Sequence, residues 1–285
     1  MAATTPKKTV FDIRQMKGSG DRITMLTAYD FGTARILDSV GIDIVLVGDS
    51  LGMVVLGYES TVPVTMDEMI HHTKAVKRGV SHALLVGDMP FLSYQAGMSE
   101  AIGNAGRFLK EAGCDAVKLE GGIEMADTIR ALTKAGIPVM GHIGLTPQTA
   151  GQLGGYKVQG KDLDSARKVL ADAEAVTEAG AFALVLECIP DSLAELITGK
   201  IAIPTIGIGA GAFCDGQVLV THDLIGVFEK FTPRFVKTYA NLAPEIRKAI
   251  EAFKKEVKTG SFPAKEHSFV MAQDIRKLLD DKEER

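Results

Sequence analysis

Short apolar runs alternate along the whole chain with segments whose apolar residues recur at helical spacing. Eight of the runs are rich in Val, Ile and Leu on both faces, which is typical of parallel strands covered by helices on both sides. The predicted strands are 23–28, 44–48, 83–87, 115–120, 138–142, 183–187, 204–208 and 217–221. The predicted helices between them include 32–40, 66–79, 99–112, 123–135, 165–179 and 191–199.

This alternation predicts a (β/α)8 TIM barrel. Several predicted helices end at a glycine just before the next strand, as at Gly41, Gly113, Gly136 and Gly180. Helix ends favour glycine because it adopts the left-handed conformation without strain. A doubly wound open sheet is the structural alternative, but it usually carries a GxGxxG loop after its first strand. The chain has TAYDFGTA at that point, which favours the barrel.

We expect a single domain over residues 1–285, with an ordered core at about 8–275. The pattern over residues 8–17 predicts a short extra helix before the first strand. Two further helices, about 243–257 and 268–280, are predicted after the eighth strand. The last residues, DDKEER, predict a charged and solvated tail.

Composition narrows the function classes. The chain has 285 residues, 46% of them hydrophobic, and a net charge of −4, which excludes a disordered chain and argues against a nucleic-acid partner. No apolar run approaches the roughly 18 residues of a spanning helix, and the N-terminus lacks the apolar segment of a signal peptide, so no membrane role is expected. Three cysteines without a CxxC pair predict reduced thiols and a cytoplasmic location.

Charged residues follow several predicted strands where each strand ends. Asp49, Asp88, Glu120 and Glu187 all occupy such positions, and in a barrel these strand ends and the following loops carry the active site. A single Asp at a strand end is usually a helix cap or a turn residue, but four carboxylates at equivalent positions indicate a site. The glycine before Asp49 and the one before Asp88 are expected to let a ligand approach the backbone.

Two basic side chains, Lys118 and His142, belong to the same rim. Lys118 and Glu120 are two residues apart on one strand and therefore share a face, so we expect both to point to the barrel mouth. The alternative is a structural ion pair that closes the top layer of the barrel. His142 ends the next predicted strand, where contact with a substrate or cofactor and a structural hydrogen bond are both open.

The candidate metal ligands are all oxygen donors. Asp49, Asp88 and Glu120 suit a hard cation such as Mg²⁺, which takes one or two carboxylates together with substrate oxygens and waters. Bound Mg²⁺ can chelate a 2-oxo acid, polarise its ketone and stabilise an enolate. Ser50 and Lys118 are then expected to hold the carboxylate of the substrate.

Glu187 differs in character from the other carboxylates. It follows the apolar run 183–186 and precedes Cys188, a setting that suits a general acid or base near neutral pH. Cys188 is a weaker candidate for a nucleophile, because neighbours on a strand face opposite ways and a buried cysteine is usually inert.

Longer motifs resemble the ketopantoate hydroxymethyltransferase family over about residues 8–275. They include VGDSLGMVVLGYESTVPVTMDEM, AVKLEGG, GIPVMGHIGLTPQ, LVLECIP and GSFPAKEHSF. The resemblance implies a barrel of the phosphoenolpyruvate/pyruvate superfamily with Mg²⁺ bound by Asp49, Asp88 and Glu120. It also implies a 2-oxo acid held by Asp49, Ser50, Asp88 and Lys118, with Glu187 as the proton acceptor.

The resemblance further implies the reaction and the assembly. A one-carbon hydroxymethyl unit would pass from 5,10-methylenetetrahydrofolate to 3-methyl-2-oxobutanoate and give ketopantoate, the first step of pantothenate and coenzyme A biosynthesis. The family also implies a homo-oligomer, a decamer built as a pentamer of dimers. Two other functions stay open. One is a lyase or mutase of the same superfamily, although its usual KKCGH-type cysteine loop is missing from the sequence. The other is a non-catalytic binding barrel.

Overall fold

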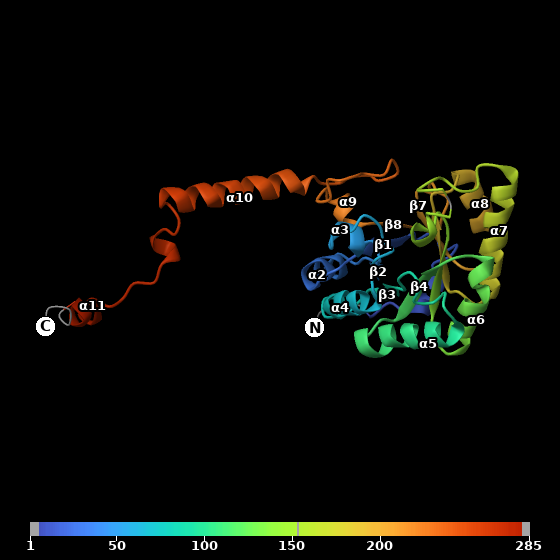
Figure 1. The fold of residues 1–285 in the computed structure, drawn as a ribbon, viewed down its shortest axis with the longest axis horizontal. Coiled ribbons are helices and arrows are strands. Elements are labelled where there is room, and N and C mark those ends of the chain that lie inside the picture. The colour runs from blue at the N-terminus through green and yellow to red at the C-terminus, as the bar shows by residue number, and fades with distance from the viewer. Residues whose placement is uncertain (1–5, 153, 281–285) are drawn as a thin grey trace.

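The computed structural model describes residues 6–152 and 154–280, and its centre is a closed barrel of eight parallel strands (Figure 1). Each strand pairs with the next one along the chain, and β8 closes the barrel against β1. The strands are β1 (Ile23–Thr27), β2 (Ile44–Val47), β3 (Leu84–Asp88), β4 (Ala116–Glu120), β5 (Val139–Gly144), β6 (Ala183–Glu187), β7 (Thr205–Ile208) and β8 (Gly216–Leu219). The predicted barrel is confirmed, and the open sheet is excluded.

Helices cover most of the outer face of the barrel. They are α2 (Phe31–Ser39), α3 (Leu51–Val54), α4 (Met66–Lys77), α5 (Met98–Arg107), α6 (Ala126–Lys134), α7 (Leu163–Glu178) and α8 (Asp191–Lys200). Capping boxes at Thr65 and Asp162 begin α4 and α7, because each side chain accepts a hydrogen bond from an otherwise unpaired backbone N–H of the first turn. The single helix predicted at 99–112 is α5 followed by a π-helical turn, η1 (Phe108–Ala112). Short 3₁₀ turns are η2 (Ile123–Met125), η3 (Pro147–Thr149) and η4 (Lys265–His267).

Inward-facing side chains fill the barrel, as the period of two along each strand requires. Ile23 and Met25 of β1 pack there with Leu84 and Val86 of β3. The predicted extra helix is α1 (Val10–Gln15), and its fully buried Ile13 joins the same cluster. The lower part of the barrel is therefore a packed apolar core, and polar residues on the same strand faces lie above it.

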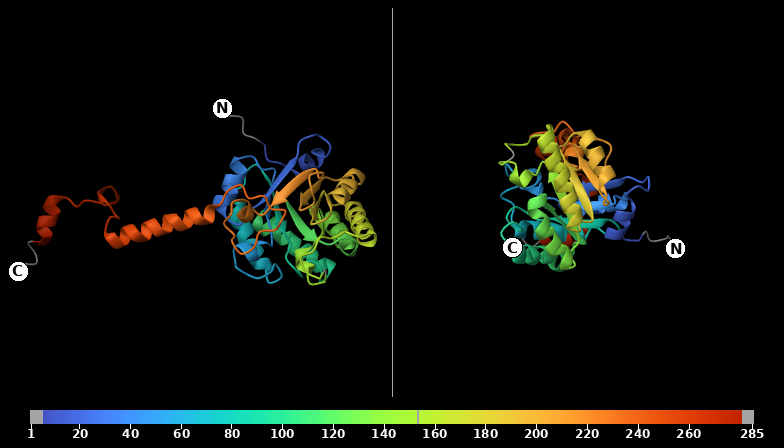
Figure 2. Two further views of the ribbon diagram at one scale, coloured as in Figure 1. Left: turned by 90° about the horizontal axis from the view of Figure 1, so that it is seen from above. Right: turned by 90° about the vertical axis from the view of Figure 1, so that its right-hand side faces the viewer.

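The chain leaves the barrel after β8. The four-residue α9 (Thr221–Leu224) is followed by a long connection and then by α10 (Leu242–Thr259), η4 and α11 (Gln273–Asp280). These residues, 242–280, form a C-terminal arm that extends away from the barrel (Figures 1 and 2). Both predicted C-terminal helices are confirmed, whereas the expected tail lies outside the described residues from 281 onward. We predicted a single domain that includes this arm, and this stays a prediction.

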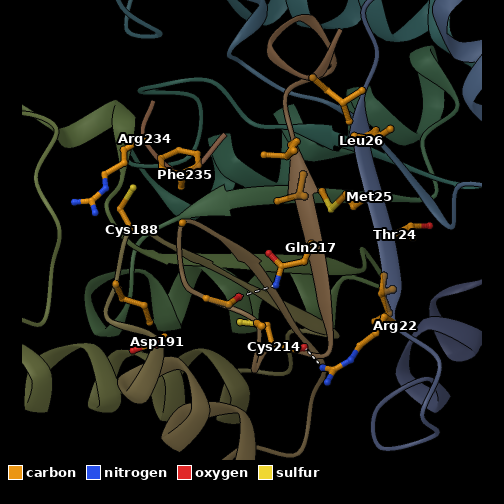
Figure 3. Close-up of a pocket in the computed structure, with 18 of the residues that line it drawn as sticks. Arg22, Thr24, Met25, Leu26, Cys188, Asp191, Cys214, Gln217, Arg234 and Phe235 are labelled. Carbon is orange, nitrogen blue, oxygen red and sulfur yellow. Dashed lines mark hydrogen bonds between the residues drawn. The ribbon is translucent and has the colours of Figure 1, made fainter. Parts of the chain in front are cut away.

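The ring of outer helices is open beside β8. β7 joins β8 through a loop at 209–215, and the outward-facing Thr24 of β1 and Gln217 of β8 are exposed. A groove of about 1330 Å³ lies along these strands (Figure 3). This cavity is on the outside of the barrel, away from the charged side chains at its mouth. Within the described ranges, no helix is both long enough and apolar enough to cross a membrane.

Candidate active site

The predicted rim residues meet inside the mouth of the barrel. Asp88 ends β3, Lys118 and Glu120 lie on β4, and His142 lies on β5. The strand register pairs Asp88 with Lys118 and Glu120 with His142. All four are buried, and all continue the inward-facing rows of apolar residues below them. The expectation that Lys118 and Glu120 point to the mouth is confirmed.

Lys118 is the central cation of this cluster. Its Nζ lies 2.8 and 2.9 Å from the two oxygens of Asp88 and 3.9 Å from Oε1 of Glu120. Burial alone would lower the pKa of Lys118, but the neighbouring carboxylates outweigh burial and raise the pKa. Lys118 is therefore charged at neutral pH, and its main partner is Asp88.

Asp49 is a third buried carboxyl group of the same cluster. It follows β2, is 5% exposed, and its backbone N–H donates to Oδ2 of Asp88 over 3.4 Å. Burial raises the pKa of Asp49 well above its ordinary range, and the charges of Asp88 and Glu120 raise it further. The ionised form of Asp49 is therefore disfavoured unless a further positive charge is present at the mouth.

His142 lies between two carboxylates. Its Nδ1 is 3.4 Å from Oε1 of Glu120, and its Nε2 is 3.1 Å from Oε2 of Glu187. Neither contact has the alignment of a hydrogen bond. Burial would lower the pKa of His142, but the two carboxylates outweigh it and raise the pKa to about 9. The Glu187 side chain is 14% exposed, against 2% for that of Glu120, so Glu187 is the more open of the two.

The two glycines of the repeated VGD triplet have different roles. A Cβ at Gly48 would lie 2.8 Å from Oγ of Ser50, so this glycine lets the Ser50 side chain pack close to the backbone, and the approach of a ligand at Gly48 stays a prediction. A Cβ at Gly87 would instead clash with the ring of Phe108. The expectation that Gly87 admits a ligand is wrong, because Asp88 faces inward and its neighbour must face the outer helices.

Three supporting residues were not predicted from the sequence. The Tyr29 hydroxyl lies 2.8 Å from Oγ of Ser50 and orients it. Gln148 donates from Nε2 to Oδ2 of Asp49 over 3.0 Å, and its Oε1 accepts from the Tyr94 hydroxyl over 2.7 Å. All three lie in loops beyond the strand ends. The only signal for Gln148 is its place in the GIPVMGHIGLTPQ motif.

The oxygen donors fit a divalent cation in type and charge. Asp49, Asp88 and Glu120 are buried hard oxygen donors, and a divalent cation would supply the positive charge that favours the ionised form of Asp49. Among the described residues, no group of three His, Cys, Asp or Glu is already arranged as a metal cage. Lys118 contacts both oxygens of Asp88, so a cation would have to share that carboxylate with the ammonium group.

Comparison with protein families gives a match over most of the chain. The model of the ketopantoate hydroxymethyltransferase family matches residues 7–265. The chain belongs to this family. Ketopantoate hydroxymethyltransferases are transferases, so the chain is an enzyme of that class, and a non-catalytic barrel is no longer favoured.

Curated relatives from bacteria agree with this family. A 3-methyl-2-oxobutanoate hydroxymethyltransferase of Desulfotalea psychrophila is 60% identical over 96% of this chain and 98% of its own length. The enzyme of the same name from Syntrophus aciditrophicus is 59% identical over 93% of this chain and 97% of its own.

Solved structures with much lower identity share the fold. Phosphonopyruvate hydrolase superposes with a TM-score of 0.59 at 15% identity, over 98% of this chain and 97% of the other. The phosphoenolpyruvate phosphomutase of Streptomyces platensis subsp. rosaceus gives 0.60 at 16%, over 96% of each chain. These likenesses concern the fold alone, and they agree with the closed barrel of this chain.

Proposed function

We propose that the protein transfers a hydroxymethyl unit from 5,10-methylenetetrahydrofolate to 3-methyl-2-oxobutanoate and forms ketopantoate. This reaction would be the first step of pantothenate and coenzyme A biosynthesis. The observation that carries the proposal is the buried ring of carboxylates around Lys118, with Glu187 at its more open edge. The shared name of the relatives supports the choice of oxo acid.

We propose Mg²⁺ as the cation, held by Asp49, Asp88 and Glu120. When bound, Mg²⁺ polarises the ketone of the oxo acid and stabilises negative charge on its oxygen. Lys118 and Ser50, together with the metal-binding aspartates, orient the carboxylate of the oxo acid. The hydrogen bond from Tyr29 limits the rotation of the Ser50 hydroxyl, which favours one substrate orientation.

Glu187 is proposed to remove the proton from carbon 3 of the oxo acid. The C–H electron pair then forms the new C–C bond to the methylene carbon of the folate, whose C–N bonds break as tetrahydrofolate leaves. A water molecule supplies the hydroxyl group, and its other proton and the proton taken from carbon 3 end on the two released nitrogens of tetrahydrofolate. Nε2 of His142 lies 3.1 Å from Oε2 of Glu187, and this contact helps to position the Glu187 carboxylate for that step.

Proton exchange tests this mechanism without the folate. The oxo acid is incubated in deuterated water with Mg²⁺ and enzyme, and deuterium at carbon 3 is measured by NMR. Glu187→Gln should slow exchange about 10²–10⁴-fold, the usual contribution of a general base. Glu195→Gln, on the exposed face of α8, is the matched control and should exchange at the wild-type rate.

Wild-type rates in Glu187→Gln would reject Glu187 as the base. Cleavage of a 2-methyl or dicarboxylic acid, with no ketopantoate formed in the complete assay, would favour a lyase of the same fold. Burial raises the pKa of the Cys188 thiol to about 12, which argues against a cysteine-dependent lyase at this position.

The cytoplasm is the proposed location. All three cysteines, Cys114, Cys188 and Cys214, are free thiols in the structure. Free thiols persist in compartments that are kept reducing, which supports this assignment.

We further propose that the protein is a homo-oligomer in which the C-terminal arm docks on a second copy. One face of α10 carries an apolar stripe, which consists of Leu242, Ile246, Ile250, Phe253 and Val257. The spacing of three and four residues places these side chains along one side of the helix. Each is 38% exposed or more, and a stripe of this kind usually marks an interaction surface.

The groove beside β8 supports a particular docking place. It exposes apolar surface of β1 and β8 where a complete ring would place a helix (Figure 3). In its own chain α10 projects away from the barrel (Figure 1). Exchange of an identical helix between two copies would cover both surfaces. Repetition of such dimers in a ring would give the decamer, a pentamer of dimers.

Light scattering after gel filtration tests the assembly. The wild type is expected at the mass of ten 30.4 kDa chains. Ile250→Asp/Phe253→Asp should lower the mass, whereas Lys248→Asp, on the polar side of α10, should leave it unchanged. A chain with Thr24→Cys, mixed with one carrying Phe253→Cys, should form a disulfide between the two. A monomeric wild type, or no cross-link, would contradict the docking.

A further inference from the structure

Gln148 connects the ends of three barrel strands inside the mouth. It lies on the turn η3 between β5 and α7 and is 3% exposed. Its Nε2 donates to Oδ2 of Asp49 over 3.0 Å and to the carbonyl oxygen of Met89 over 2.9 Å. Its backbone N–H donates to Oε2 of Glu120 over 3.0 Å. One residue therefore holds one oxygen of each of two carboxylates.

Tyr94 fixes the direction in which this amide points. Its ring is buried, and its hydroxyl donates to Oε1 of Gln148 over 2.7 Å. The oxygen of the same hydroxyl accepts a hydrogen bond from the backbone N–H of Glu120 over 3.1 Å. Since the acceptor end of the amide is taken by Tyr94, the NH₂ end must face Asp49. A tyrosine hydroxyl is protonated at neutral pH and can therefore donate this hydrogen bond.

An amide differs from Lys118 in what it does to the carboxylates. Lys118 contacts both oxygens of Asp88 and brings a positive charge. Gln148 fixes Asp49 and Glu120 through hydrogen bonds and brings no charge. The two carboxylates are held in place while their attraction for a cation is kept. Partners of this kind commonly orient metal ligands.

We propose that Gln148, oriented by Tyr94, is a positioning residue that presents the second oxygens of Asp49 and Glu120 to the divalent cation. This inference rests on the proposed function, because it concerns the cation that the carboxylates are proposed to hold. Gln148 contacts neither the substrate nor the metal itself and acts only through Asp49 and Glu120. Its loss should therefore weaken cation binding, even when no substrate is present.

Calorimetric titration of the EDTA-treated full-length protein with Mg²⁺ tests this role. Gln148→Met keeps the length of the side chain and the backbone hydrogen bond but removes the amide. Its dissociation constant for Mg²⁺ should rise about 10–100-fold, the usual loss when a supporting hydrogen bond to a metal ligand is removed. Gln152→Met makes the same change at an exposed position four residues on and should bind Mg²⁺ as the wild type does.

The remaining outcomes separate this inference from the proposed function. If the wild type binds no Mg²⁺ and forms no ketopantoate, both are wrong. If the wild type does both and Gln148→Met binds Mg²⁺ equally well, only the positioning role is wrong. If Gln148→Met does not fold, as judged by circular dichroism, Tyr94→Phe decides the question. It removes one hydroxyl and should weaken Mg²⁺ binding severalfold, and unchanged affinity would overturn the inference.

Discussion

The barrel mouth and the C-terminal arm place their side chains in opposite environments. At the mouth, charged groups that normally prefer water are buried, and Asp88, Lys118 and Glu120 are each 4% exposed or less. On the arm, apolar groups that normally prefer burial are open, and Phe253 and Phe269 are 56% and 106% exposed. Both arrangements cost free energy unless a partner offsets them.

The two regions differ in where the partner is found. At the mouth, the buried charged groups form ion pairs or hydrogen bonds within the same chain. Asp88 forms an ion pair with Lys118, and Asp49 accepts a hydrogen bond from Gln148. On the arm, Phe253 of the apolar stripe has an edge-to-face contact with Phe262 of the same chain, with 5.6 Å between the ring centroids, and every residue of the stripe is still 38% exposed or more. The partners of the buried charges at the mouth are therefore present in a single copy, whereas the surface that would cover the stripe is proposed to come from another copy.

The largest expected effect concerns the mouth. Lys118→Met removes the central cation and leaves the carboxylates around it without their main counter-charge. Removing one member of a buried ion pair costs about 3–5 kcal/mol. We expect this loss in the apparent free energy of unfolding, measured by urea denaturation in the presence of EDTA.

The matched substitution on the arm is Lys254→Met, at an exposed position of α10. It should change the unfolding free energy by less than about 0.5 kcal/mol, as is usual for surface sites. Equal losses at the two lysines would contradict the view that buried charge at the mouth depends on partners within the chain.

The sequence predicted most of the fold because the barrel repeats one local pattern. Eight apolar runs and the helices between them gave every strand to within about two residues. The inward direction of Lys118 and Glu120 followed from the period of two along a strand. The same rule, applied to Gly87, would have placed this glycine against the outer helices instead of at the site.

Other parts of the site depend on where loops return in three dimensions. Gln148 reaches Asp49 across 99 positions of sequence, and Tyr29 reaches Ser50 from the end of a different strand. Neither contact has a periodic signal, because loop conformation follows from tertiary packing. His142 was recognised as a candidate, but its place between Glu120 and Glu187 required the register of three strands.

A smaller effect, dependent on pH, is expected at Asp38 in the barrel body. Its carboxylate accepts hydrogen bonds from the backbone N–H groups of Ser81, His82 and Ala83, and His82 also contacts it through Nδ1 at 2.9 Å. Burial acts to raise the pKa of Asp38, but these bonds outweigh it and hold the pKa below its ordinary value of 3.8. Asp38→Asn replaces one acceptor oxygen by a donor, which should cost about 1–3 kcal/mol at pH 7.

The sign of the pH dependence follows from the lowered pKa of Asp38. The ionised carboxylate stabilises the folded state above its ordinary pKa, and this contribution is lost as the pH falls through the lower value of the folded state. The difference between wild type and Asp38→Asn should therefore be largest near pH 7 and should shrink below about pH 4. Urea denaturation at both pH values measures it, and a difference that grows in acid would contradict the assignment.

The smallest effect is expected where the arm does meet its own chain. Nη2 of Arg247 on α10 lies 3.0 Å from Oε2 of Glu229, and these side chains are 57% and 58% exposed. An exposed pair of this kind contributes less than about 1 kcal/mol, so Arg247→Met should leave both the unfolding free energy and the oligomer mass nearly unchanged. A large drop in either quantity would mean that the arm is held by this contact within its own chain. The apolar stripe would then lose its role as the main attachment of the arm, and the contrast between mouth and arm would no longer hold.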